Sequence, residues 1–178
     1  MLLRTIRVSR RGFLIATAGV GAGAAVLIVG CSDDGEPDVA SLSYERTRLA
    51  ALDELSPGEP FTFAYPAEGQ SNFLLKLGAP AQGGIGPDGD IVAFSYLCTH
   101  MGCPLVGQYN DEHKIMGPCP CHFTTFDLRQ NGMVVLGQAT QNLPQIALDV
   151  EDGEVFATGV TGLFYGAASN LRDVEAAS

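Results

Sequence analysis

Two short stretches near the middle of the chain decide its fold and its chemistry. They are Cys98-Thr99-His100-Met101-Gly102-Cys103-Pro104-Leu105 and Gly117-Pro118-Cys119-Pro120-Cys121-His122. Four of the five cysteines and two of the three histidines lie in these stretches, together with several Gly and Pro residues. Gly and Pro form tight loops, and thiols and imidazoles are common ligands of transition metals. We therefore expect two loops that hold a small group between them.

Three kinds of chemistry can be built from this residue set. One zinc ion takes four N or S ligands, but Cys-x-His combined with Cys-x-x-His is not zinc-finger spacing. Two structural disulfides suit an exported protein, but they leave both histidines without a role. A [2Fe–2S] cluster with two thiolates on one iron and two imidazoles on the other uses every residue, if the remaining two cysteines cross-link the loops.

The sequence around the two loops predicts short strands and no sustained helix. Apolar and β-branched runs are bounded by Gly, Pro and Asp, which is typical of strands. A short helical turn is expected over Leu49–Leu55 before the first strand. The expected strands are Phe61–Tyr65, Asn72–Leu77, Ile91–Leu97, Met133–Leu136 and a hairpin of Ile146–Val150 with Glu154–Thr158. Many short strands at this spacing predict an all-β antiparallel sandwich or barrel.

Composition and charge narrow the class of function. The 178 residues are 46% hydrophobic, with 22 Gly, 10 Pro and no Trp, which favours a loop-rich fold over a helical bundle. The formal net charge is −10. From Cys31 onward six Lys and Arg stand against twenty Asp and Glu, a net charge of −14. No nucleic-acid partner is expected, because such binding needs a basic face.

The first 31 residues are expected to form an export signal rather than a part of the fold. Four arginines precede an uncharged run over Phe13–Val29, which acidic residues then end. Arg10-Arg11 with the following Gly-Phe-Leu resembles the twin-arginine motif, which implies export of an already folded protein. The run could remain as an anchor, be cleaved, or end in a lipidated Cys31, since Ile28-Val29-Gly30-Cys31 resembles a lipobox. Residues 32–43 are expected to form a flexible tether, and the protein to be periplasmic or held on the outer face of the cytoplasmic membrane.

The two Cys–His stretches resemble those of the Rieske iron–sulfur proteins. The resemblance covers roughly Tyr44 to Gly166, within an expected domain over 44–170. It implies a Rieske-type antiparallel β-sandwich or barrel with a small cluster-binding subdomain of two loops. It also implies one [2Fe–2S] cluster held by Cys98 and Cys119 on one iron and by His100 and His122 on the other. A disulfide between Cys103 and Cys121 would tie the two loops together.

Other segments favour one branch of this family. The disulfide pair is typical of bc-type complexes and arsenite oxidase, and generally absent from Rieske ferredoxins and oxygenases. The segments Gly137–Ile146 and Gly159–Gly166 resemble the small subunit of bacterial arsenite oxidase. That resemblance implies an electron-transfer subunit beside a molybdopterin-containing catalytic subunit, with a c-type cytochrome or cupredoxin as acceptor. The alternatives are the Rieske subunit of a bc-type quinol-oxidising complex and an exported binding domain without a cluster.

Two positions after the second stretch bear on the reduction potential. Thr124 stands where bc-type relatives have Ser, and its hydroxyl could still donate to a cluster sulfide. Phe126 stands where they have Tyr, so one donor is missing. Because hydrogen bonds to cluster sulfurs raise the potential, we expect a value below that of quinol-oxidising relatives. We also expect Met101 and Met116 to pack around the cluster, and the polar loop Gln108–Lys114 to be longer than usual.

Overall fold

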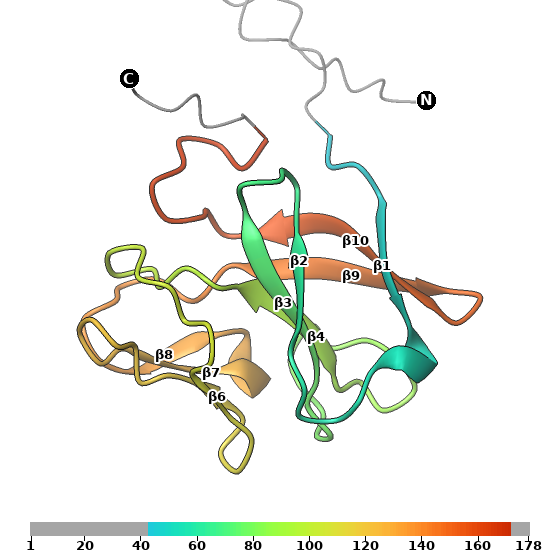
Figure 1. The fold of residues 1–178 in the computed structure, drawn as a ribbon, viewed down its shortest axis with the longest axis horizontal. Coiled ribbons are helices and arrows are strands. Elements are labelled where there is room, and N and C mark those ends of the chain that lie inside the picture. Colours follow the sequence, from blue (N-terminus) through green and yellow to red (C-terminus); the bar gives the residue numbers. More distant parts are fainter. Residues whose placement is uncertain (1–42, 172–178) are drawn as a thin grey trace, which may run out of the picture. The chain divides into compact units, whose positions relative to one another are not determined.

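The computed structural model describes residues 43–171, and its larger sheet has six antiparallel strands (Figure 1). Their order is β1-β10-β9-β4-β3-β2. Their bounds are β1 Thr47–Ala51, β2 Phe61–Ala64, β3 Ser71–Lys76, β4 Ile91–Ser95, β9 Gln145–Glu151 and β10 Glu154–Thr161. The pairing of β1 with β10 brings the first strand of this unit beside the last one.

Strands β3 and β4 are buried on both faces, so they separate two hydrophobic cores. Successive side chains of a strand point to opposite faces. Phe73 and Phe94 accordingly face one core, which also contains Leu105, Met116 and Leu128. Leu74 and Ala93 face the other core, with Ala50, Ile146, Val155 and Ala157 from strands β1, β9 and β10. Burial on both faces explains why β4 is a continuous apolar run instead of an alternating one.

A smaller four-stranded sheet carries the two Cys–His stretches. Its order is β5-β6-β7-β8, and its bounds are β5 Tyr109–Asn110, β6 Ile115–Met116, β7 Thr125–Asp127 and β8 Met133–Leu136. The first stretch lies between β4 and β5, and the second lies between β6 and β7. Met116, Phe126 and Leu128 pack against the outer face of β3 and β4, which attaches this subdomain to the larger sheet.

The all-β fold with a small cluster-binding subdomain is confirmed. The expected strands occur, with β8 at the predicted bounds and the others shifted by one to three residues at their ends. The helical turn over Leu49–Leu55 was wrong in part. Only Leu52–Glu54 forms a short 3₁₀ helix, and Thr47–Ala51 is strand β1. The apolar residues of this segment are compatible with a helix or a strand, and hydrogen-bonded pairing with β10 stabilises the strand.

The long polar loop Gln108–Lys114 is largely a hairpin formed by β5 and β6. Its turn is held by Asp111, which accepts hydrogen bonds from Tyr109 Oη at 2.9 Å and Lys114 Nζ at 2.7 Å. The signal over 1–31, including Arg10, Arg11 and Cys31, lies outside the described residues, as does nearly all of the tether. Among residues 43–171, no helix is long and apolar enough to cross a membrane.

Candidate metal centre

The first loop begins where β4 ends and is closed by hydrogen bonds around Cys98. The Cys98 N–H donates to the Cys103 carbonyl at 2.9 Å, and the Gly102 N–H donates to the Cys98 carbonyl at 2.8 Å. Gly102 has φ of +70°, a left-handed conformation that glycine adopts without strain. The loop therefore turns back on itself over four residues and places Cys98 at its base.

The second loop repeats this arrangement around Cys119. The Cys119 N–H donates to the Thr124 carbonyl at 2.8 Å, and the Phe123 N–H donates to the Cys119 carbonyl at 2.8 Å. Phe123 has φ of 62° and is the counterpart of Gly102. The two loops are thus structural equivalents, each with one cysteine at the base and one histidine nearer the tip.

The structure brings the four predicted ligands together in two pairs. Cys98 and Cys119 are free thiols, each only 1% exposed. The rings of His100 and His122 meet edge to face, with centroids 4.7 Å apart. His122 is exposed and His100 is partly buried. The sulfur ligands would therefore lie on the protein side and the imidazoles toward solvent.

The remaining two cysteines form the expected disulfide. Cys103 and Cys121 are bonded, with Cα atoms 6.4 Å apart. The sulfur atoms of Cys103, Cys119 and Cys121 all lie within 4.8 Å of one another. This trio is not a metal site in itself, because the sulfurs of Cys103 and Cys121 are consumed in the S–S bond. It shows instead that the disulfide lies directly beside the Cys119 thiol.

Unpartnered polar atoms at the centre of the loops fit a sulfur-rich cofactor with histidine ligands. His100 Nδ1 and Thr124 Oγ1 are buried and have no hydrogen-bond partner in the protein. Buried polar atoms are nearly always paired, so these two are expected to face another group. Two free buried thiols beside them supply the rest of the donor set that a mixed S and N centre requires.

Burial raises the pKa of the Cys98 thiol above its ordinary value, and the neighbouring Cys119 sulfur adds to this effect. A hydrogen bond from the His100 backbone acts in the opposite direction and favours the thiolate. The Thr124 hydroxyl lies near Cys98 and has no hydrogen-bond partner in the protein. A bound metal ion lowers the pKa of a coordinating thiol and would hold this one ionised.

Three supporting contacts were not predicted from the sequence. The Thr99 hydroxyl donates to the Gln141 carbonyl at 2.7 Å, which ties the first loop to the β8–β9 connection. Tyr165 lies against Gly102, and Gly137 lies against the backbone of Thr124. Glycines 102 and 137 were visible in the sequence, but the partners that require them come from distant segments.

Three other residues singled out in the sequence, Met101, Met116 and Phe126, differ in how deeply they are buried. Met116 is fully buried in the core beneath the loops, as expected. Met101 is 58% exposed and, unlike Met116, does not belong to this core. It lies beside the left-handed residue Gly102, and the loop directs it outward. Phe126 is fully buried in the same core as Cys98 and Cys119.

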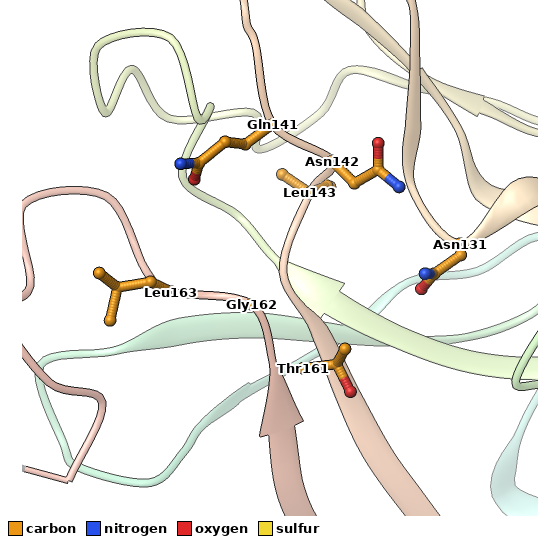
Figure 2. A pocket seen from close by; sticks show the side chains of 7 residues that line it. All are labelled: Asn131, Gln141, Asn142, Leu143, Thr161, Gly162 and Leu163. Atoms are coloured by element: carbon orange, nitrogen blue, oxygen red, sulfur yellow. The ribbon is translucent and has the colours of Figure 1, made fainter.

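A cavity of about 420 Å³ lies near the loops, between the β8–β9 connection and the end of β10 (Figure 2). Its side chains include three amides and one hydroxyl, from Asn131, Gln141, Asn142 and Thr161. None of the lining residues is charged or a usual metal ligand, so the cavity is not a second metal site. Gln141 connects it to the first loop through the bond from Thr99.

An all-β unit with two equivalent loops, each presenting a buried cysteine and a histidine, and with a disulfide between them, defines an iron–sulfur protein of the Rieske class. The chain belongs to the Rieske [2Fe-2S] domain family, whose model matches residues 45–147. The [2Fe–2S] cofactor is thereby confirmed.

Two similar proteins are iodate reductase subunits IdrB. The one from Denitromonas iodatirespirans is 46% identical over 164 residues, which cover 91% of this chain and 86% of that protein. The one from Pseudomonas sp. (strain SCT) is 54% identical over 134 residues, covering 75% of this chain and 69% of that protein. These relatives are not named as arsenite oxidase subunits.

More distant similarity also lies within the family. The cytochrome bc1 complex Rieske subunit of Streptomyces lividans is 44% identical, but over only 62 residues, 35% of each chain. The soluble domain of Rieske protein II (soxF) from Sulfolobus acidocaldarius superposes with a TM-score of 0.63 at 26% identity. That match covers 70% of this chain and 82% of the other.

Proposed function

We propose that this chain is the electron-transfer subunit of an oxidoreductase whose substrate site is on a larger, molybdopterin-containing subunit. The observation that carries the proposal is the pair of equivalent loops, which together hold the free, buried thiols of Cys98 and Cys119 and the paired rings of His100 and His122. The similarity to iodate reductase subunits over most of the chain supports the role as a subunit.

The ligand assignment follows from the donor atoms. Cys98 and Cys119 would hold one iron, and His100 and His122 the other. His100 would bind through Nδ1, the atom that is buried without a partner. The cluster supplies uptake and release of one electron at a time. The protein buries the sulfur side and leaves the His122 edge exposed, so that edge is where a redox partner can approach.

Iodate reduction is the reaction that we favour for the whole enzyme. Identity of 46% over 91% of the chain connects it to a subunit of that name. Electrons would then enter from a periplasmic donor, such as a c-type cytochrome or cupredoxin, and continue to the catalytic subunit. Arsenite oxidase is the second candidate, supported by the resemblance of Gly137–Ile146 and Gly159–Gly166. In an arsenite oxidase the electrons would flow the other way, from the catalytic subunit through this chain to the periplasmic carrier. The short match to bc1 subunits makes quinol oxidation the weaker alternative.

Purified complex tests these possibilities. Wild-type complex should oxidise reduced cytochrome c when iodate is added, whereas complex that contains His122→Ser should not. A small artificial donor that reduces the catalytic subunit directly should still support iodate reduction by both the wild-type and the His122→Ser complex. Arsenite-dependent reduction of cytochrome c, with no iodate activity, would favour the second candidate. Cytochrome-dependent activity in the variant equal to that of wild type would contradict the electron-transfer role.

Export remains part of the proposal. Arg10, Arg11 and the lipobox-like end at Cys31 support a periplasmic location with a lipid anchor, since Cys31 has no place in the cluster scheme. Cys31→Ala should release the protein from membranes or leave an unprocessed precursor. A mature N-terminus well beyond residue 31 without lipid mass would rule the anchor out.

A further inference from the structure

Phe123 has a backbone conformation that its side chain does not favour. Its φ of 62° lies in the left-handed region, where a bulky aromatic residue is a rare outlier. The equivalent position in the first loop is Gly102, with φ of +70° and the same hydrogen bond to the base cysteine. A glycine would therefore form the second loop equally well, so the backbone does not require Phe123.

The core does not require Phe123 either. The side chain is 67% exposed, the largest exposed fraction among the large hydrophobic residues of the described part of the chain. It belongs to neither of the two buried cores. Strain at a loop tip without compensating burial indicates a function for the side chain. Its neighbour in the chain is His122, the exposed imidazole of the cluster site.

The chain segments that contain Phe123 and both cluster loops carry no charged side chain. Residues 91–110, 115–126, 130–148 and 155–171 contain no Asp, Glu, Lys or Arg. Eight of the nine exposed large hydrophobic residues fall in these segments, and only Phe61 lies elsewhere. Contacts place several of them at the cluster loops: Tyr165 lies against Gly102, and Leu136 precedes Gly137, which lies against Thr124. We call Met101, Phe123, Leu136, Leu163 and Tyr165 the uncharged surface.

We propose that Phe123 is the anchor by which the uncharged surface docks onto the larger catalytic subunit, inserting into a neutral, apolar pocket there. The proposal rests on the proposed function, which requires a partner at the His122 edge. Exposed aromatic residues surrounded by apolar contacts are typical anchors of protein interfaces.

The charge distribution of this chain favours the catalytic subunit over a second copy of the chain as the partner at the uncharged surface. Outside the uncharged surface, the described residues hold five Lys and Arg against fourteen Asp and Glu. Two copies docked face to face would bring two acidic bodies together, which like-charge repulsion disfavours. A catalytic subunit whose docking face carries no negative charge would meet no such repulsion, and its affinity should change little with salt.

Phe123→Gly separates the docking role from a structural role. It removes the side chain and relieves the backbone strain, so the melting temperature of the isolated chain should stay the same or rise. The visible spectrum of the cluster should not change. The affinity for the large subunit, isolated from wild-type complex, should fall about 30-fold. Phe61→Ala, which removes an exposed phenylalanine from β2, should leave that affinity unchanged.

Phe123→Leu keeps an apolar side chain and should bind with intermediate affinity. Wild-type affinity should vary less than about threefold between ~50 and ~500 mM salt. Unchanged affinity in Phe123→Gly would overturn the anchor, as would equal losses in Phe123→Gly and Phe61→Ala. Self-association of the isolated wild-type chain that Phe123→Gly abolishes would show a second copy to be the occupant. A wild-type chain with its cluster intact that binds no large subunit would overturn both this proposal and the proposed function.

Discussion

The ring of Tyr165 lies so close to Gly102 that a β-carbon on residue 102 would come within 2.5 Å of Tyr165 Cδ1. Tyr165 follows the last strand, whereas Gly102 lies in the first cluster loop. The C-terminal segment therefore covers the loop that presents Cys98 and His100, and the loop can pack this tightly only without a side chain at residue 102. The same residue has φ of +70°, so two independent constraints meet there.

Gly102→Ala should therefore destabilise the protein by about 1–3 kcal/mol, because it introduces both a steric clash and backbone strain. The visible absorbance of the cluster should be lost at a lower temperature than in wild type. The double variant Gly102→Ala/Tyr165→Ala, which removes the ring, should recover the part of the stability loss that is due to the clash. A double-mutant cycle measures this part. A single variant with wild-type melting temperature would show that the contact is not rigid.

His122→Ser should abolish the Rieske-type EPR signal of the reduced protein, because an imidazole ligand is lost. The matched control is His113→Ser, which replaces an exposed histidine of the β5–β6 turn. The control should keep the native signal. A native signal in His122→Ser would show the ligand assignment to be wrong.

Cys103→Ser should lower the free energy of unfolding by about 3 kcal/mol, the value expected when a loop of this length is opened. The cluster should be lost more readily on dilution or heating, since the disulfide lies beside Cys119. Cys121→Ser should behave in the same way, because either change removes the same bond. Different cluster retention in the two variants would indicate that one of these cysteines has a second role.

Phe126→Tyr should raise the reduction potential, because a hydroxyl in the core that holds Cys98 and Cys119 can donate to a cluster or cysteine sulfur. Thr124→Val should lower it by removing the hydroxyl that now lies unpartnered at the centre of the loops. Redox titration followed by EPR measures both shifts. Absence of an upward shift, in a Phe126→Tyr structure with the hydroxyl within about 3.2 Å of a sulfur, would reject this account of tuning.

Tyr65→Phe should remove a loss of stability at alkaline pH. Tyr65 is 2% exposed and its hydroxyl has no partner. Burial raises the pKa of Tyr65 to about 12, above the ordinary value of 10.0 that applies when the chain unfolds. The unfolded state therefore ionises first, and stability present below about pH 10 declines as the pH rises to about 12. Denaturant unfolding at several pH values should show a shallower decline in the variant. Equal slopes in both proteins would assign the decline to other groups.

The sequence by itself determined the cluster chemistry because the decisive residues are local. Cys98 lies two residues from His100, and Cys119 three residues from His122, so each loop carries its predicted donors in one short, turn-forming segment. Strand β4 was likewise visible, because burial on both faces needs an unbroken apolar run. Only the tertiary structure decided which distant segments close around the loops.

Thr47–Ala51 became a strand because β10, more than a hundred residues away, offers an edge to pair with. The equivalence of Gly102 and Phe123, and the outward position of Met101, depend on backbone torsions that the turn residues permit without specifying. The cover that Tyr165 forms over Gly102 depends on how β10 delivers the C-terminal segment. Contacts between residues far apart in the chain are set by packing of whole elements, whereas ligand spacing and strand periodicity are properties of neighbouring residues.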